Sequence, residues 1–264
     1  MALAKSTTPE PTYNETVSGY TFLKSGPKHL KSKAEYEAEF TQTALRILKE
    51  NLGADYPPEP VDLFKLKESL GADKLISKAV NRASTGTWKD ASGRAIAFLP
   101  ELTAARFALW SQSPFADAAN NAANAEHYVK RTRNLNGTLE SEILEGWGGI
   151  TTHFHIPNYA PPNPADPDRQ FLNKLPDYPY QGSGDKVLMD GEVFGVLHIS
   201  VKDVKGAEFG SALDGVEIFA SVWYGDGVQD EHLEVEVQHI TVEIINLTLQ
   251  ASRDIVSGAF KPSV

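Results

Sequence analysis

The feature that most constrains the fold is the amphipathic segment at residues 230–257, which is followed by Gly258. At 3.6 residues per turn, its apolar side chains fall on a broad arc of one helical face. A helix well beyond the globular mean of about 12 residues needs tertiary packing of that arc to be stable in water. Residues 230–257 are therefore predicted to form one long helix packed on another layer of the domain.

The layer that this helix covers is indicated by the segments before it. Residues 142–156, 186–203 and 215–224 are rich in β-formers, and Asp190-Gly191 is a favoured type I′ hairpin turn. The first half of the chain instead carries helical patterns. Helices followed by hairpin-linked strands predict an α+β fold, with N-terminal helices, an antiparallel sheet in the second half and a long C-terminal helix packed on the sheet. In architecture alone this arrangement resembles helix-grip ligand-binding folds, and the resemblance implies no particular function.

The domain organisation follows from the same patterns. Residues 1–32 are polar and contain three prolines, so we expect a poorly ordered arm there. Residues 33–264 are expected to form a single α+β domain. Its helical part covers 33–140, and the sheet plus the closing helix cover 141–258.

The first helix of that domain has a clear start signal. Ser32 and Glu35 form a capping-box pattern, and apolar residues then recur at helical spacing over about 33–50. The other expected elements are helices near 61–70, 72–83, 101–112 and 115–132, a short strand at 95–99, and a long connection at 157–185 that holds seven prolines.

Composition excludes several classes of function. Cysteine is absent, which rules out disulfides, thiolate nucleophiles and cysteine-ligated metal clusters. Residues 141–264 carry 7 Lys+Arg against 19 Asp+Glu, a balance of −12 within a net charge of −10, so nucleic acid and anionic membranes are not expected partners. No nucleotide or flavin fingerprint is present. Without a signal-peptide pattern we expect a soluble cytoplasmic protein, and the sequence leaves a homo-oligomer open.

The predicted strands each have an aliphatic face and a mixed face. Successive side chains of a strand point to opposite sides, so each strand can be divided into two faces. With 147–156 taken as one continuous strand, the mixed faces carry aromatic, hydroxyl and imidazole groups. A solvent-exposed face rarely displays so many aromatic side chains together, and we expect them to line a cavity shared with the last helix. The ligand is expected to be a small hydrophobic or aromatic organic molecule. The predicted pocket residues are Trp147, Phe194, His198, Phe219 and Trp223.

The last helix carries a polar stripe within its apolar arc. At 100° per residue, His232, Glu236, His239 and Glu243 fall on one line, where an ordinary amphipathic helix would carry leucine. Polar groups that point inward need partners. The other histidines of the second half are His153, His155 and His198, whereas His29 and His127 are expected at the surface.

Three interpretations of this stripe stay open. It is a buried structural network, a general acid–base site, or a metal site. The acid–base residues would be His239, Glu236, His232 and Glu243, together with His155 from a strand. A divalent transition metal would be held by His153 and His155, with His239 or Glu236 completing the set.

The functional hypothesis with the most support from the sequence is a small-molecule enzyme. An aromatic pocket with His/Glu acid–base groups suits an isomerase, a cyclase or a lyase. One alternative is a metal-dependent oxygenase or hydrolase that uses non-haem iron or zinc. The other alternative is a protein that binds a hydrophobic ligand without catalysis.

Overall fold

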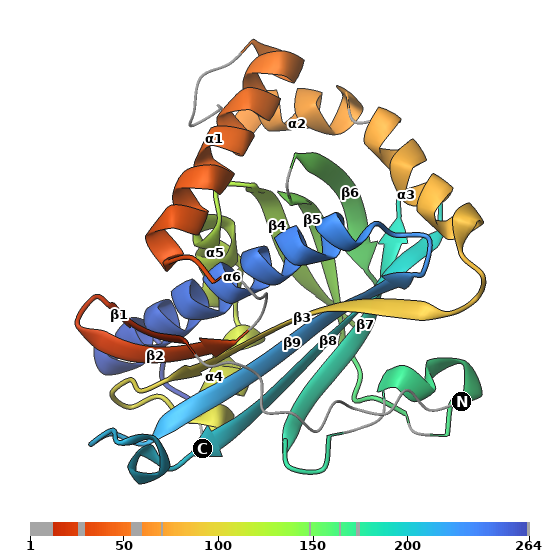
Figure 1. The fold of residues 1–264 in the computed structure, drawn as a ribbon. Coiled ribbons are helices and arrows are strands. Elements are labelled where there is room, and N and C mark those ends of the chain that lie inside the picture. Colours follow the sequence, from red (N-terminus) through yellow and green to blue (C-terminus); the bar gives the residue numbers. More distant parts are fainter. Residues whose placement is uncertain are drawn as a thin grey trace.

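A computed structural model describes residues 13–25, 30–53, 60–69, 71–147, 149–163, 165–172 and 175–262. Within these residues, nine strands form one antiparallel sheet with the order β1-β2-β3-β9-β8-β7-β6-β5-β4 (Figure 1). The strands are β1 (Tyr13–Val17), β2 (Tyr20–Ser25), β3 (Trp88–Ala97), β4 (His127–Leu135), β5 (Thr138–Trp147), β6 (Ile150–Ile156), β7 (Tyr180–Leu188), β8 (Val193–Val204) and β9 (Gly215–Gly225). The helices are α1 (Lys33–Leu52), α2 (Pro60–Ser69), α3 (Gly71–Ala83), α4 (Ala104–Ser111), α5 (Pro114–Ala123) and α6 (Asp230–Val256), with short 3-10 turns η1 (Pro167–Leu172) and η2 (Gly206–Phe209).

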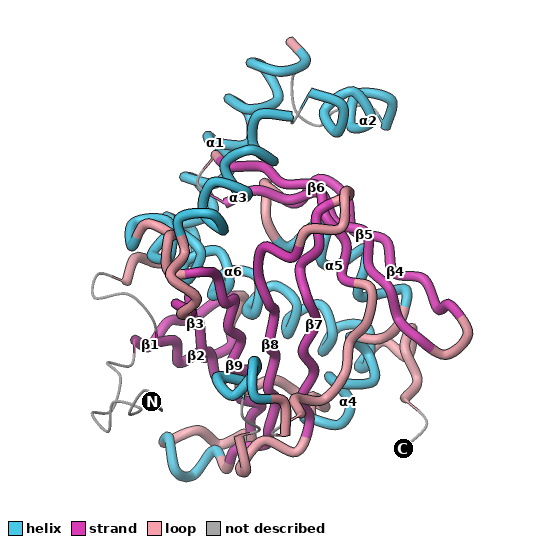
Figure 2. Tube along the Cα trace, turned by 90° about the vertical axis from the view of Figure 1, so that its right-hand side faces the viewer, coloured by secondary structure: helices cyan, strands magenta, loops and turns pink. Residues whose placement is uncertain are grey.

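The predicted α+β fold is confirmed, with α6 packed along one face of the sheet. The sheet curves around this helix, and a view turned by 90° shows α6 running behind β8 and β7 (Figures 1 and 2). Small residues on β3 let the helix approach closely. A Cβ atom added at Gly93 would lie 2.7 Å from Cγ2 of Ile240 on α6. We call the face that α6 covers the inner face, and the opposite one the outer face.

Three of the remaining helices, α1, α4 and α5, pack against α6. The capping box predicted for α1 is present, since the Ser32 hydroxyl accepts from the backbone of Glu35 while the Glu35 carboxylate accepts from Ser32. The apolar side of α1 is buried and contacts Val242 of α6 through Tyr36 and Phe40. The helices α4 and α5 also contact α6. No described helix is long and apolar enough to cross a membrane.

Three sequence predictions in the first half are wrong. The part at 33–140 is not only helical, because it also holds β3 and β4. Residues 13–25 form the β1–β2 hairpin at the edge of the sheet rather than a poorly ordered arm, because β2 pairs with β3. The expected helix at 115–132 ends at Ala123, and β4 begins at His127. The side chain of Asn124 accepts from the backbone N–H of Glu126 at 3.0 Å, a local bond that competes with helix continuation.

The assignment of side chains to the two faces of the strands, inferred from simple alternation, is wrong at two places. The stretch 142–156 is a hairpin, so the turn between Trp147 and Ile150 restarts the alternation. In β8, Phe194 is the extra residue of a bulge, because Lys186 pairs with Gly195 and Val187 pairs with Val193. Both aromatic side chains are therefore brought to the inner side, with Trp147 and Phe194 in the main hydrophobic core.

Candidate ligand cavity and its polar end

A cavity of about 560 Å³ lies between the inner face of the sheet and α6. This volume falls within the range of about 300–1,000 Å³ that is typical of small-molecule sites. Strand alternation supplies aliphatic side chains along most of its length, and α6 supplies the opposite wall. The aliphatic lining includes Leu197, Ile199, Ile218, Ala220, Val222 and Ile244.

Charged and titratable side chains gather in the same lining. Five of them come from three elements that the fold brings together: Glu145 from β5, Lys186 from β7, and Glu236, His239 and Glu243 from α6; Lys130 of β4 lines the cavity as well. The polar stripe predicted on the last helix therefore faces the interior at these three positions. An apolar cavity with a few convergent polar groups is the usual form of a small-molecule binding site.

Lys186 is a buried cation surrounded by aromatic rings. Its side chain is 3% exposed, and its Nζ lies 4.2 Å from the ring centroid of Trp147 and 4.7 Å from that of Phe154. Phe194 and Tyr224 complete the surround at 5.5 Å each. The ammonium also donates to the Tyr224 hydroxyl at 3.3 Å. Cation–π attraction strengthens when the cation is desolvated, and these rings hold the charge at the cavity wall.

Glu236 is a buried carboxyl group with one free oxygen. The Tyr224 hydroxyl donates to its Oε1 at 3.3 Å, whereas its Oε2 is buried without a hydrogen-bond partner. Burial raises the pKa of Glu236 to about 7, although the positive charge of Lys186 opposes the shift. The group therefore changes protonation state near neutral pH, and its Oε2 belongs to a side chain that lines the cavity.

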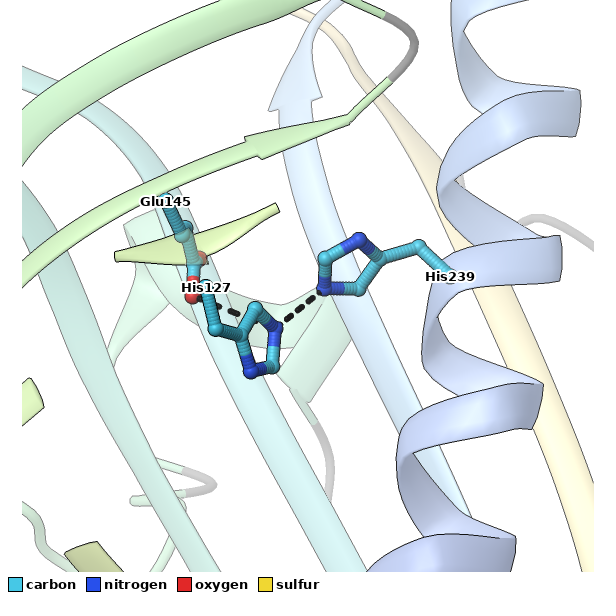
Figure 3. Close-up of side chains that lie close together, drawn as sticks. All are labelled: His127, Glu145 and His239. Carbon is cyan, nitrogen blue, oxygen red and sulfur yellow. Dashed lines mark hydrogen bonds and ion pairs between the residues drawn. The ribbon is translucent and has the colours of Figure 1, made fainter. Parts of the chain in front are cut away.

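His127 and His239 form a direct imidazole pair (Figure 3). Their Nε2 atoms lie 2.7 Å apart, so one ring must donate and the other accept. His127 Nδ1 faces the backbone oxygen of Asn120 and must donate to it, which leaves His127 Nε2 as the acceptor. His239 then carries its proton on Nε2 and accepts from the Asn124 amide at Nδ1, over 3.4 Å. Burial, with smaller effects of His127 and Lys186, holds the pKa of His239 well below its ordinary value.

Glu145 connects this imidazole pair to Lys186. Its Oε2 lies 3.8 Å from His127 Nε2, and its Oε1 lies 3.8 Å from the Lys186 Nζ. Glu243 lies on the other side, 4.0 Å from His239 Nε2, and accepts from the side chain of Asn120. The histidines therefore stand between two carboxylates.

His232 belongs to the same end of α6 but has a structural partner. The Trp147 indole N–H donates to its Nε2, and the ring packs edge-on against both Trp147 and Tyr224. Burial, with the nearby charge of Lys186, lowers the pKa of His232 to about 4. This histidine is neutral at physiological pH and anchors α6 to β5.

The predicted pocket residues do not line the cavity. Trp147 and Phe194 stand behind it as part of the aromatic surround of Lys186. His198, Phe219 and Trp223 alternate with cavity-lining residues and therefore point to the outer face. The connection before β7 packs over that face, where Tyr178 donates to Glu217 at 2.7 Å. The aromatic side chains of β9 therefore lie on the outer side, where Phe219 and Trp223 are partly exposed, and the aliphatic faces line the cavity.

The predicted metal set is also not assembled. His153 and His155 point away from the cavity, and His153 Nε2 lies 3.0 Å from Glu142. In the part of the chain that the structure describes, the one group of three potential ligands that lies close enough to hold a metal ion is His127, Glu145 and His239. Of the four predicted ligands, only His239 belongs to it.

Sequence reasoning missed four residues of the polar end: Glu145, Lys186, Tyr224 and His127. His127 was expected at the surface, but it is buried in β4 opposite Glu145, a position that depends on the pairing of β4 with β5. Lys186 and Tyr224 are set on the inner face by the register of β7, β8 and β9. No local pattern marks Lys186 as an interior residue, because β7 reads YQGSGDKVL and is polar up to this lysine. His29 lies outside the described residues.

Comparisons with known proteins provide little guidance. No family model and no curated protein matches the chain. The crystal structure of Ara h 8.0201 is similar at a TM-score of 0.37 and 11% identity, over 65% of this chain and 99% of that one. An uncharacterized protein from Rhizobium leguminosarum gives 0.39 and 15%, over 63% and 97%. Ginseng major latex-like protein 151 from Panax ginseng gives 0.34 and 11%, over 66% and 99%. Similarities this low do not indicate what this chain binds.

Proposed function

We propose that the protein binds one small organic molecule with an apolar body in the cavity between the sheet and α6. The observation that carries this proposal is the cavity of about 560 Å³, which is lined mainly by apolar side chains and also by Lys186 and Glu236. The ligand's apolar body would contact Ile218 and Val222. Its polar group, a carboxylate or a carbonyl oxygen, would meet the Lys186 ammonium and the carboxyl of Glu236.

The polar end supports this choice of ligand. The three donor hydrogens of a lysine ammonium need acceptors, and the contacts of Lys186 to Tyr224 and Glu145 are long, at 3.3 and 3.8 Å. Glu236 Oε2 is buried without any partner. A buried polar atom without a partner costs about 1–3 kcal/mol, and a ligand oxygen that satisfies both groups would recover that free energy.

The test of binding uses 8-anilinonaphthalene-1-sulfonate, a fluorescent apolar probe with one anionic group. We expect saturable binding at one site, because the cavity offers an apolar wall and a buried cation. Ala220→Trp places an indole in the cavity and should weaken binding by more than about 10-fold, equivalent to about 1.4 kcal/mol. Gly182→Trp is a second occluding variant, since a Cβ atom at Gly182 meets no other atom within 4 Å.

The matched control is Leu213→Trp. Leu213 is 44% exposed and lies outside the cavity, so this variant adds the same ring without filling the site. Equal probe affinity in the Ala220→Trp, Gly182→Trp and Leu213→Trp proteins would refute cavity binding. Compounds that displace the probe from the unmodified chain would then define the ligand class.

A second candidate function is acid–base catalysis on the bound molecule, of the isomerase, cyclase or lyase type. It is favoured by Glu236, because a carboxyl with a pKa raised to about 7 by burial both donates and accepts a proton near neutral pH. Compounds that displace the probe should take up deuterium from D₂O in the presence of the protein, as measured by mass spectrometry. Glu236→Gln should abolish this uptake while probe binding persists. Uptake at an unchanged rate in Glu236→Gln would exclude Glu236 as the acid–base group.

A further inference from the structure

We propose that His127, Glu145 and His239 bind one divalent transition metal ion at the polar end of the cavity. Each of the three residues offers one ligand atom, and these atoms lie within 4.8 Å of one another (Figure 3). They come from three separate elements, β4, β5 and α6, so the tertiary fold brings them together. Two imidazoles with one carboxylate suit zinc or non-haem iron. The site does not depend on the organic ligand proposed above.

Two of the three ligand pairs require only small side-chain movements, whereas the pair of Glu145 and His239, whose ligand atoms lie within 4.8 Å, requires the largest approach. Metal–ligand bonds of about 2.0–2.1 Å in a tetrahedral site place neighbouring ligand atoms about 3.3 Å apart. The Nε2 atoms of His127 and His239 are 2.7 Å apart, so they need to separate by a few tenths of an ångström. Glu145 Oε2 is 3.8 Å from His127 Nε2 and needs to approach by a similar amount. Rotation about side-chain bonds covers both changes.

Two of the three ligands already have the hydrogen-bond partners that a metal site requires. His127 directs Nδ1 at the backbone oxygen of Asn120, which leaves the lone pair of Nε2 available to a metal. Glu145 directs Oε1 toward Lys186, which leaves Oε2 on the side of the histidines. The carboxylate of Glu243, 4.0 Å from His239 Nε2, adds negative charge that favours a cation there.

His239 is the ligand that must change state. A metal on its Nε2 moves its proton to Nδ1, where the Asn124 amide now presents its own N–H at 3.4 Å. The amide must rotate to accept this proton, and its oxygen then leaves the backbone N–H of Glu126, to which it bonds at 3.0 Å. In Asn124→Asp, one carboxylate can accept from both groups. The substitution should therefore tighten metal binding.

A bound ion would face the cavity. Glu145 and His239 line the cavity, whereas His127 lies behind them. Three protein ligands on one side leave a further coordination position open toward the interior, which is the arrangement of catalytic rather than structural zinc sites. An oxygen of a cavity ligand or a water molecule would take that position.

The test titrates Co²⁺ into the full chain, purified without a histidine tag and treated with a chelator. We expect the visible absorption of Co²⁺ in a low-coordinate nitrogen–oxygen site at a stoichiometry of one per chain, with loss of the signal on addition of Zn²⁺. His127→Gln and His239→Gln should each weaken Co²⁺ binding by more than about 100-fold, beyond the 10–100-fold typical for loss of a group that only orients a ligand. Asn124→Asp should strengthen binding by about 10-fold.

The matched control is His198→Gln, which removes a buried histidine that contacts Gln181 on the outer face, at 3.1 Å. Its Co²⁺ affinity should equal that of the unmodified chain. Absence of Co²⁺ binding, or equal affinity in folded His127→Gln protein, would overturn the proposal. If the glutamine variants do not fold, X-ray absorption of the Co²⁺ complex of the unmodified chain decides: two imidazole ligands are expected, and oxygen ligands alone would overturn the site. The assay with 8-anilinonaphthalene-1-sulfonate contains no metal, so it tests the organic-ligand cavity alone. The Co²⁺ titration tests the metal site alone, and either proposal can therefore fail without the other.

Discussion

Gly93→Val is expected to lower the free energy of unfolding by about 2–3 kcal/mol, near the upper end of the cost of overpacking a core. The reason is the close approach of α6 to β3. A Cβ atom at Gly93 would lie 2.7 Å from Cγ2 and 3.1 Å from Cβ of Ile240, and 3.2 Å from the Thr241 hydroxyl. The first two of these neighbours are close to the helix backbone, so relief requires α6 to move away from the sheet. Urea unfolding followed by tryptophan fluorescence measures the change.

Gly182→Val is the matched control for this prediction. Gly182 also lies in a strand and lines the cavity, but nothing lies within 4 Å of a Cβ atom there. Valine at this position should leave stability unchanged or raise it slightly, since it reduces the freedom of the unfolded chain. Equal destabilisation by the two substitutions would show that glycine content, and not the contact with α6, explains the effect.

Glu236→Gln is expected to stabilise the protein increasingly as the pH rises from 5 to 8. Burial raises the pKa of Glu236 to about 7 from an ordinary value of 4.5, so the folded state holds its proton more tightly than the unfolded chain. The stability that this proton contributes is fully present below pH 4.5 and is lost as the pH rises through 7. At 1.36 kcal/mol per pKa unit, the loss amounts to about 3 kcal/mol by pH 8. Glutamine is neutral at every pH, so the Glu236→Gln protein should not lose this stability as the pH rises.

The measurement compares free energies of unfolding in urea at several pH values for both proteins. The difference between Glu236→Gln and the unmodified chain isolates Glu236 from His232 and His239, whose lowered pKa values instead destabilise the fold as the pH falls below about 6.5. Glu234→Gln, on the exposed side of the same helix, controls for the loss of a surface carboxylate. A difference that stays constant from pH 5 to 8 would contradict the role of burial.

The sequence pattern of the last helix was sufficient to predict that its polar stripe points to the interior. The spacing of His232, Glu236, His239 and Glu243 within an apolar arc depends only on the pitch of a helix, and three of these side chains line the cavity in the structure. The boundaries of α1 and α6 and the hairpin at Asp190-Gly191 were likewise available, because capping residues, turn residues and apolar periodicity act within a few residues of one another.

What the sequence by itself determined is the α+β class, the long closing helix and the inward direction of its polar stripe, because each depends on contacts between neighbours along the chain. The tertiary structure alone decided which strand face lines the cavity and which residues meet the stripe. A turn after Trp147 and a bulge at Phe194 each reverse the side to which aromatic residues point. The meeting of His127 and Glu145 with His239 depends on the pairing of β4 with β5 and on the packing of α6 against the sheet, which joins His127 to a residue 112 positions later. Such long-range register is set by the packing of the whole sheet, and one residue of slip moves every side chain to the opposite face.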